Sequence, residues 1–164
     1  MIAIAALACG ACRRTEAAPS PIVAPAGWKA APELAKAASD AAKPNANDGV
    51  KVVAAEAWSE PARGCYGVSL RLEGAAVAID AAADQLVASV QKAGVTVSDV
   101  VKPAAGKDDA RGVLALRFAT AKYHGLLRAE LAKTGEVFAV SCLWNQREPK
   151  TCEAACGKLV EAVR

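Results

Sequence analysis

The sequence has few of the residues that most often support catalysis or nucleic-acid binding. Histidine occurs once, at His124, and aromatic residues make up only 4% of the 164 residues. A lone histidine with no identifiable carboxylate or nucleophile partner is a weak candidate for a general base. The net charge of +3 provides no large basic field for nucleic acid. We therefore expect a protein that is not an enzyme and does not bind nucleic acid.

Long apolar runs are also missing. A membrane-spanning helix needs roughly 20 apolar residues, whereas the apolar run at the N-terminus covers only residues 1–8. This run leads through small residues directly into Cys9, which is typical of a bacterial lipoprotein signal whose cysteine is lipidated after cleavage. We predict residues 1–8 as a signal-peptide remnant and Cys9 as the lipidation site, with Cys12 as the alternative. The other interpretation is an apolar N-terminus with unpaired thiols.

Residues 9–60 are rich in Ala and Pro and have no sustained apolar period. This composition favours an extended, semi-stiff spacer, so we predict a tether here. A short helix is expected at residues 32–43, because Pro suits the first helical turn and Ala propagates a helix well. The alternative is that part of the segment packs on the domain through Trp28 or Trp58.

From Cys65 onward, apolar residues recur at regular spacing. Alternation of apolar and polar residues indicates strands, and spacing by three or four indicates amphipathic helices. Strands are expected near residues 66–72, 95–101, 114–118 and 138–142. Helices are expected near residues 79–93, 123–134 and, capped by Thr151, 151–163.

The two halves of this region resemble each other. Ser69-Leu70-Arg71-Leu72 matches Ala115-Leu116-Arg117-Phe118, and the helix predicted after each ends in Lys-x-Gly. Strand, helix, strand, twice over, is the ferredoxin-like βαββαβ pattern. We therefore predict an α+β fold for residues 61–164: a two-layer sandwich with an antiparallel sheet of order 4-1-3-2, both helices on one face, and an added C-terminal helix.

Residues 65–145 resemble an uncharacterised family of bacterial envelope lipoproteins, whose domain has two strand–helix–strand units. The resemblance rests on Leu114-Ala115-Leu116-Arg117-Phe118, which fits an L-x-L-R-[VF] strand, and on Gly135-Glu136-Val137, which fits a "G-x-V" return. It implies a location in the bacterial cell envelope, with the protein exported and membrane-anchored. It supplies no catalytic residues.

The binding motifs of other ferredoxin-like proteins are not present. A copper carrier needs Cys-x-x-Cys after the first strand, where this sequence has Glu73-Gly74-Ala75-Ala76. An RNA-recognition domain stacks bases on aromatic residues of its third strand, where Val113 and Ala115 stand instead. We expect no cofactor and no bound metal. Arg71 and Arg117 occupy matching positions opposite the helices and form a candidate anion site, if they do not pair with acidic neighbours.

Four cysteines lie in the predicted domain, at Cys65, Cys142, Cys152 and Cys156. An even number in an exported protein favours disulfides. Cys152 and Cys156 are poorly aimed at each other within a regular helix, which leaves two pairings that fasten the last helix to the sheet. A direct Cys65–Cys142 bond remains open, and so does the redox interpretation of Cys152 and Cys156.

These observations favour a non-catalytic, lipid-anchored protein of the cell envelope, with a structural or partner-binding domain. Its expected partners are the membrane, through the lipid, and an envelope protein. A thiol–disulfide redox protein that uses Cys152 and Cys156 is the first alternative. A secreted domain that binds a small ligand on its open sheet face is the second.

Overall fold

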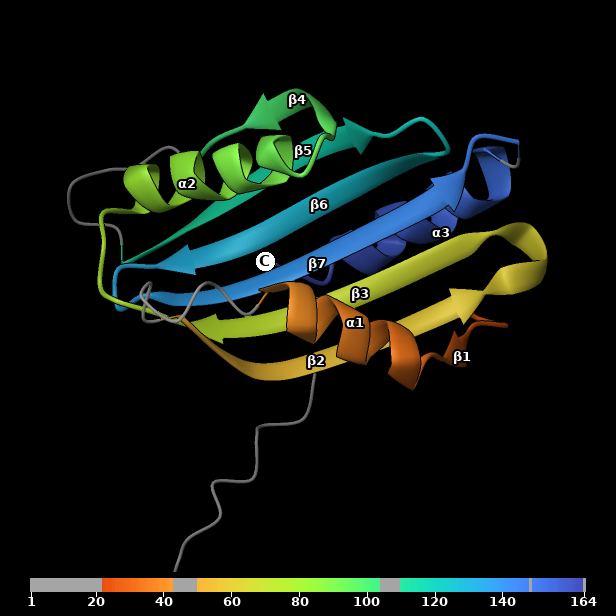
Figure 1. The fold of residues 1–164 in the computed structure, drawn as a ribbon, viewed down its shortest axis with the longest axis horizontal. Coiled ribbons are helices and arrows are strands. Elements are labelled where there is room, and N and C mark those ends of the chain that lie inside the picture. Colours follow the sequence, from red (N-terminus) through yellow and green to blue (C-terminus); the bar gives the residue numbers. More distant parts are fainter. Residues whose placement is uncertain (1–21, 43–49, 104–109, 148, 164) are drawn as a thin grey trace, which may run out of the picture.

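The computed structural model describes residues 22–42, 50–103, 110–147 and 149–163. Within them, seven strands form one antiparallel sheet of order β1-β2-β3-β7-β6-β5-β4 (Figure 1). The strands are β1 (Lys29–Ala30), β2 (Lys51–Glu60), β3 (Cys65–Glu73), β4 (Thr96–Val101), β5 (Arg111–Ala119), β6 (Tyr123–Ala132) and β7 (Glu136–Asn145). The helices are α1 (Pro32–Ala42), α2 (Ile79–Lys92) and α3 (Pro149–Val160), with a short 3₁₀ turn at Pro61–Arg63. The predicted α+β class is confirmed.

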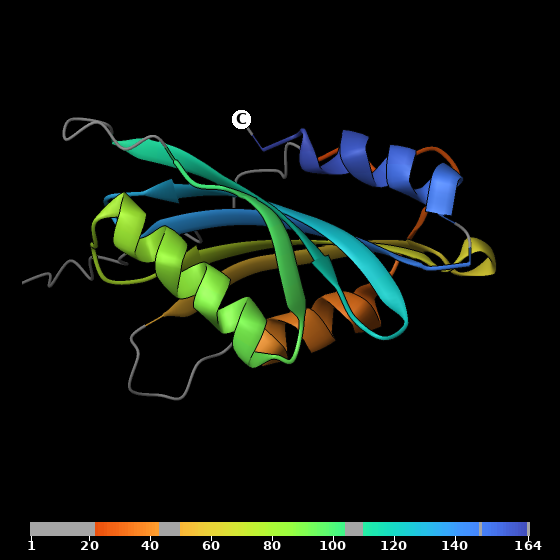
Figure 2. The ribbon, with the colours of Figure 1, turned by 90° about the horizontal axis from the view of Figure 1, so that it is seen from above.

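Helices cover both faces of the sheet. Helices α1 and α2 lie on one face, and α3 lies on the other, beside the segment that leads into β1 (Figure 2). Helix α1 packs on β2 and β3, α2 packs on β4, β5 and β6, and α3 packs on β7 and β6. The molecule therefore has three layers rather than the two that the sequence predicts.

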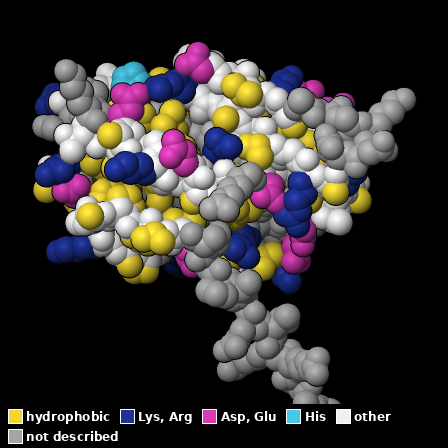
Figure 3. All heavy atoms as spheres, turned by 180° about the vertical axis from the view of Figure 1, so that it is seen from behind, with side chains coloured by type: hydrophobic (Ala, Val, Ile, Leu, Met, Phe, Trp, Pro, Cys, Tyr) yellow, Lys and Arg dark blue, Asp and Glu magenta, His cyan; other side chains and the backbone are white. Residues whose placement is uncertain are grey.

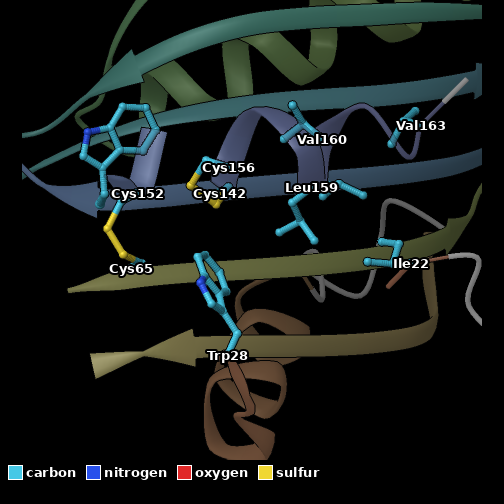
Figure 4. Close-up of a cluster of buried hydrophobic side chains, with 11 residues drawn as sticks. Ile22, Trp28, Cys65, Cys142, Cys152, Cys156, Leu159, Val160 and Val163 are labelled. Carbon is cyan, nitrogen blue, oxygen red and sulfur yellow. A yellow bond between two sulfur atoms is a disulfide. The ribbon is translucent and has the colours of Figure 1, made fainter. Parts of the chain in front are cut away.

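Each face of the sheet has its own apolar core. Beneath α2, Ile79 and Ala83 pack on Leu114, Leu116 and further residues of β5 and β6. Beneath α3, a second cluster joins that helix to β3, β7 and the segment before β1 (Figure 4). Its members are Ile22, Trp28, Cys65, Val140, Cys142, Trp144, Cys152, Cys156, Leu159, Val160 and Val163. The cysteines thus belong to the core of the α3 face.

Most of the elements predicted after Cys65 are present. Strands β3, β4, β5 and β7 and helix α2 agree with the expected segments to within a few residues. Helix α2 closes at Gly94, whose φ of +76° suits glycine. Helix α1 also forms as predicted, from Pro32. Helix α3 begins at Pro149, so Thr151 lies inside the helix and does not cap it.

The predicted second helix is wrong. Residues 123–132 form strand β6, which pairs with β5 on one side and β7 on the other. Both faces of β6 are covered, because Leu127 packs toward α2 and Leu126 toward α3. A strand buried on both faces loses the alternation of apolar and polar residues, and here its apolar residues fall by chance at helical spacing.

The predicted ferredoxin-like topology is consequently not confirmed. The predicted pairs of first with fourth strand and second with third strand do occur, as β3 with β7 and β4 with β5. The predicted pair of first with third strand does not occur, because β7 and β6 lie between β3 and β5. An additional strand, β2, pairs along β3, and the short β1 pairs with β2.

The structure also differs from the predicted tether. Residues 51–60 form β2, which pairs with β3 from Lys51 to Glu60, and residues 32–42 form α1. Trp28 is buried against the α3 face, as the alternative prediction for this segment stated. Alanine-rich segments give little hydrophobic signal in the sequence, yet they allow a helix to approach a strand closely. Residues 9–21 lie outside the described residues.

Candidate functional site

Two disulfides fasten α3 to the sheet. Cys152 of α3 bonds to Cys65 at the start of β3, with the two Cα atoms 5.7 Å apart. Cys156, one turn further along α3, bonds to Cys142 of β7, with a Cα–Cα distance of 5.3 Å. The prediction of disulfides is confirmed, and the connectivity is one of the two that join the last helix to the sheet.

The disulfides are shielded from solvent. Each of the four cysteines is at most 1% exposed. Trp144, Leu159 and Trp28 belong to the same buried cluster. Cys152 and Cys156 are not bonded to each other, which is the pair that the redox alternative requires. Thiol–disulfide exchange requires a thiolate from another molecule to reach a sulfur atom of the disulfide. Burial of both disulfides therefore disfavours the redox alternative.

The predicted lipidation site cannot be placed in the structure. Cys9 and the alternative Cys12 both lie outside the described residues. No helix in the described part of the chain is long and apolar enough to span a bilayer.

The two arginines predicted as a joint anion site lie on the same face of the sheet but do not meet. Arg71 is on β3 and Arg117 is on β5, with β7 and β6 between them, so three strand spacings, roughly 14 Å, separate them across the sheet. The register also offsets Arg117 by four residues along β5 from the position that lies across from Arg71. Arg117 forms ion pairs with Glu153 of α3 at 2.9 Å and with Asp99 at 3.5 Å. The Arg71 guanidinium lies over the ring of Phe138, 5.2 Å from its centroid.

His124 is exposed at the start of β6, where the sequence predicts a helix. Its ring lies beside the indole of Trp144, with the ring centroids 6.4 Å apart. Among the described residues, no group of three or more His, Cys, Asp and Glu side chains gathers at one point where a metal ion could bind.

A cleft of about 610 Å³ opens on the α3 face, beyond the C-terminal end of the helix. We call it the α3-side cleft. It is lined by Val53, Arg71, Leu72, Glu73, Arg111, Glu130, Glu136, Val137, Phe138, Glu161 and Ala162. Figure 3 shows the face of the molecule to which it belongs, where acidic and basic side chains are interspersed with apolar ones.

The charges in the α3-side cleft are partly paired. Arg111 donates to Glu130 and lies 3.6 Å from Glu136, and the hydrogen bond to Glu130 is the main reason that the pKa of Arg111 is raised. Glu73 lies directly opposite Glu136 across β3 and β7. Like charges at directly opposed positions repel. Glu73 and Glu161 have no ion pair in the described part of the chain.

Of the residues that line this cleft, only Arg71 was a candidate site residue in the sequence, as part of the predicted anion site with Arg117. The acidic residues come from three strands, β3, β6 and β7, and from the turn that follows α3. Only the strand register places Glu73 beside Glu136 and Glu130 beside Phe138. No local sequence motif predicts such a cleft, because the residues that line it are alternate residues of different strands.

A scan against protein-family models finds no match, and a search of curated proteins finds no significant match.

Proposed function

We propose that the protein is an exported, lipid-anchored component of the bacterial cell envelope, with a non-catalytic domain that binds a partner or has a structural role. The observation that supports this proposal most is the pair of buried disulfides between α3 and the sheet. Disulfides persist in oxidising compartments outside the cytosol and are rare within it. An exported location agrees with the lipoprotein-like sequence around Cys9.

The proposed anchor sets how far the domain reaches from the membrane. Residues 32–42 and 51–60 belong to the folded domain, so the connection from Cys9 runs only to Ile22. A chain of this length spans at most roughly 45 Å when fully extended. Lipidation at Cys9 would therefore hold the domain near the bilayer, where it would meet membrane proteins and lipid-anchored neighbours.

Expression with a complete lipoprotein leader in a bacterium tests the location. We expect the protein in the membrane fraction, with two or more acyl chains at its mature N-terminus, because one chain anchors only marginally. Cys9→Ser should leave the protein soluble or unprocessed, and Cys12→Ser should have no effect. A soluble protein with an unmodified N-terminus would show that the anchoring proposal is wrong. Lipid lost only in Cys12→Ser would move the site to Cys12.

The volume of the α3-side cleft favours small-ligand binding as a second candidate. Its 610 Å³ falls in the range of pockets that hold small molecules, roughly 300–1,000 Å³. A thermal-shift screen of the purified protein against small molecules tests whether the α3-side cleft binds a ligand. Ligands of the cleft should raise the melting temperature of the native protein but not that of Phe138→Ala, which lacks the only aromatic ring in the lining.

A further inference from the structure

Only part of the outer edge of β2 is paired, because β1, the outermost strand of the sheet, is two residues long. Strand β1 pairs only with Trp58 and Ser59, and the next residue along, Ala31, donates its N–H to the Ala57 carbonyl at 2.8 Å. From there toward Lys51, the outer edge of β2 has no strand beside it in the described part of the chain. Backbone groups of such an edge are a template for pairing with another extended segment.

Backbone alternation identifies the unpaired groups. The Ala57 carbonyl faces outward, and groups two residues apart in a strand face the same way, so the N–H and C=O of Ala55 also face outward. Neither group of Ala55 has an outward backbone partner among the described residues. The backbone N–H and C=O groups of Glu56 and Ala54, in contrast, face β3, where these residues pair with Ser69 and Arg71.

A groove of about 790 Å³ runs beside these groups, between the β2 edge and α1. Figure 1 shows α1 lying across β2 next to β1. We call it the β2-edge groove. Its lining is Ile22, Ala30, Ala31, Pro32, Ala35, Lys36, Ser39, Ala55, Glu56, Ala57 and Trp58. Small side chains predominate, so an extended backbone can come close to the edge. A strand edge with a helix as its second wall suits peptide recognition by strand addition.

The charges in the groove indicate which peptide fits. Lys36 is already paired with Asp40, at 2.6 Å. Glu56 is half-buried, lines the groove and has no ion pair among the described residues. A basic side chain on the added strand would complement Glu56, whereas an acidic one would be repelled.

Two features limit the length of the added strand and argue against self-pairing. The register of β2 with β3 shifts between Val52 and Ala54, which is a β-bulge, and Lys51 stands at the exposed end of the strand. Bulges and edge lysines are common protections against edge-to-edge association. They leave Ala54–Glu56 as the accessible part, because the Ala57 carbonyl already accepts from Ala31, and so short a stretch suits a peptide better than a second copy of the sheet.

We propose that the β2-edge groove binds a short extended peptide segment of a partner protein, with small side chains toward α1 and a Lys or Arg beside Glu56. The inference rests on the partner-binding role proposed above and specifies its surface. Backbone hydrogen bonds from Ala55 would supply affinity, and the basic residue would supply specificity. The added segment would continue the ladder that β1 begins.

Selection from a bead-displayed library of random hexapeptides, with the purified full-length protein, tests the proposal. We expect selected peptides to combine a Lys or Arg with Ala, Ser or Val and to exclude Pro at the pairing positions. Methylating the backbone nitrogen of a pairing residue should abolish binding. Glu56→Gln should weaken binding of the basic peptides at least several-fold and remove the preference for Lys and Arg.

A proline substitution separates docking from folding. Ala55→Pro removes an outward N–H that contributes nothing to the β2–β3 ladder, and Pro is tolerated at such edge positions. We expect it to reduce binding more than tenfold while leaving the melting temperature nearly unchanged. Ala54→Pro is the matched control, because its N–H faces β3 and its loss should lower the melting temperature.

Several outcomes would overturn the proposal. They are a library that yields no binding peptide, peptides that bind Ala55→Pro as tightly as the native protein, and peptides that lose affinity on Phe138→Ala in the α3-side cleft instead. Concentration-dependent dimers in light scattering, absent in Ala55→Pro, would assign the edge to a second copy of the chain. Membrane fractionation does not depend on this surface, so failure of the anchoring proposal would be recognised separately.

Discussion

Gly67 lies on β3 directly beneath α3. A Cβ atom at this position would lie 2.4 Å from Cδ2 of Leu159 and 3.1 Å from Cζ3 of Trp28. Leu159 is 2% exposed and Trp28 is 9% exposed, so neither side chain can swing into solvent without opening the core. Figure 4 shows the two side chains pointing toward each other at β3. The absence of a side chain at Gly67 therefore lets helix, strand and N-terminal segment meet.

Gly67→Ala should lower the free energy of unfolding by about 1–3 kcal/mol, the usual effect of forcing extra volume into a packed core. Gly157→Ala is the control, since a Cβ there meets nothing within 4 Å. Replacing that helical glycine should raise stability by up to about 1 kcal/mol. Urea unfolding followed by circular dichroism measures both. Equal effects of the two substitutions would contradict the packing of α3 on β3.

Strand β6 has apolar residues at helical spacing although it is a strand. The segment is covered by α2 on one face and α3 on the other, so apolar residues occur on both faces. In its pairing with β5, Gly125 of β6 lies opposite Phe118. A Cβ at Gly125 would fall 2.1 Å from Cζ of Phe118, which means that the phenyl ring covers the glycine.

A double-mutant cycle at this pair tests the strand assignment. Gly125→Ala should destabilise the native protein by about 1–3 kcal/mol, because the Phe118 ring must move. In a Phe118→Ala background, the same substitution should be nearly neutral, which gives a coupling energy of the order of 1 kcal/mol or more. Additive effects would mean that the two residues do not face each other, as in the helical prediction for residues 123–134.

Local patterns sufficed for the elements that are buried on one face. The strand at 114–118 and the helix at 79–93 were predicted because one face of each is apolar. The strand at 66–72 is covered on both faces, by α1 and by α3, and was predicted because Gly67, Ser69 and Arg71 keep an alternation in its sequence. Strand β2 was missed because its run of Ala between Val53 and Trp58 carries little hydrophobic signal and Pro61 follows it. The order of the sheet was missed with β6, since one strand read as a helix removes two strand pairings.

Of the features of the candidate site, only the disulfides could be predicted from the sequence, because cysteine is the residue type that forms them. The number of cysteines predicts disulfides, and the geometry of a helix disfavours a Cys152–Cys156 bond without excluding it. The α3-side cleft and the β2-edge groove depend on register and on which edge stays unpaired. Those are properties of the assembled sheet. The position of Glu56 in the groove and of Phe138 in the cleft therefore could not be predicted without the pairing of β2, β3 and β7.

The whole molecule is a sheet with helices on both faces, and its α3 layer is held covalently. One disulfide closes a loop with a sequence separation of 87 residues and the other a loop of 14. In the chain-entropy description, a cross-link stabilises more when the loop that it closes is longer. The Cys65–Cys152 bond, from β3 to α3, should therefore contribute the larger share.

Replacing each disulfide by a pair of alanines measures the two contributions. We expect a loss of about 4–5 kcal/mol for Cys65→Ala with Cys152→Ala, and about 3 kcal/mol for Cys142→Ala with Cys156→Ala. Thermal unfolding without reductant reports both. A larger loss from the shorter loop would show that packing around Cys142 and Cys156, rather than loop closure, dominates.

Two buried disulfides fasten α3 to the sheet, and we proposed above that the domain is exported. Peptide mapping without reduction, on protein isolated from the cell envelope after alkylation of free thiols, checks the location and the disulfide connectivity in one experiment. We expect Cys65 linked to Cys152, Cys142 linked to Cys156, and no alkylation at these four residues in the native state. Four alkylated thiols, or a Cys152–Cys156 bond that mild reductant opens without lowering the melting temperature, would contradict this connectivity.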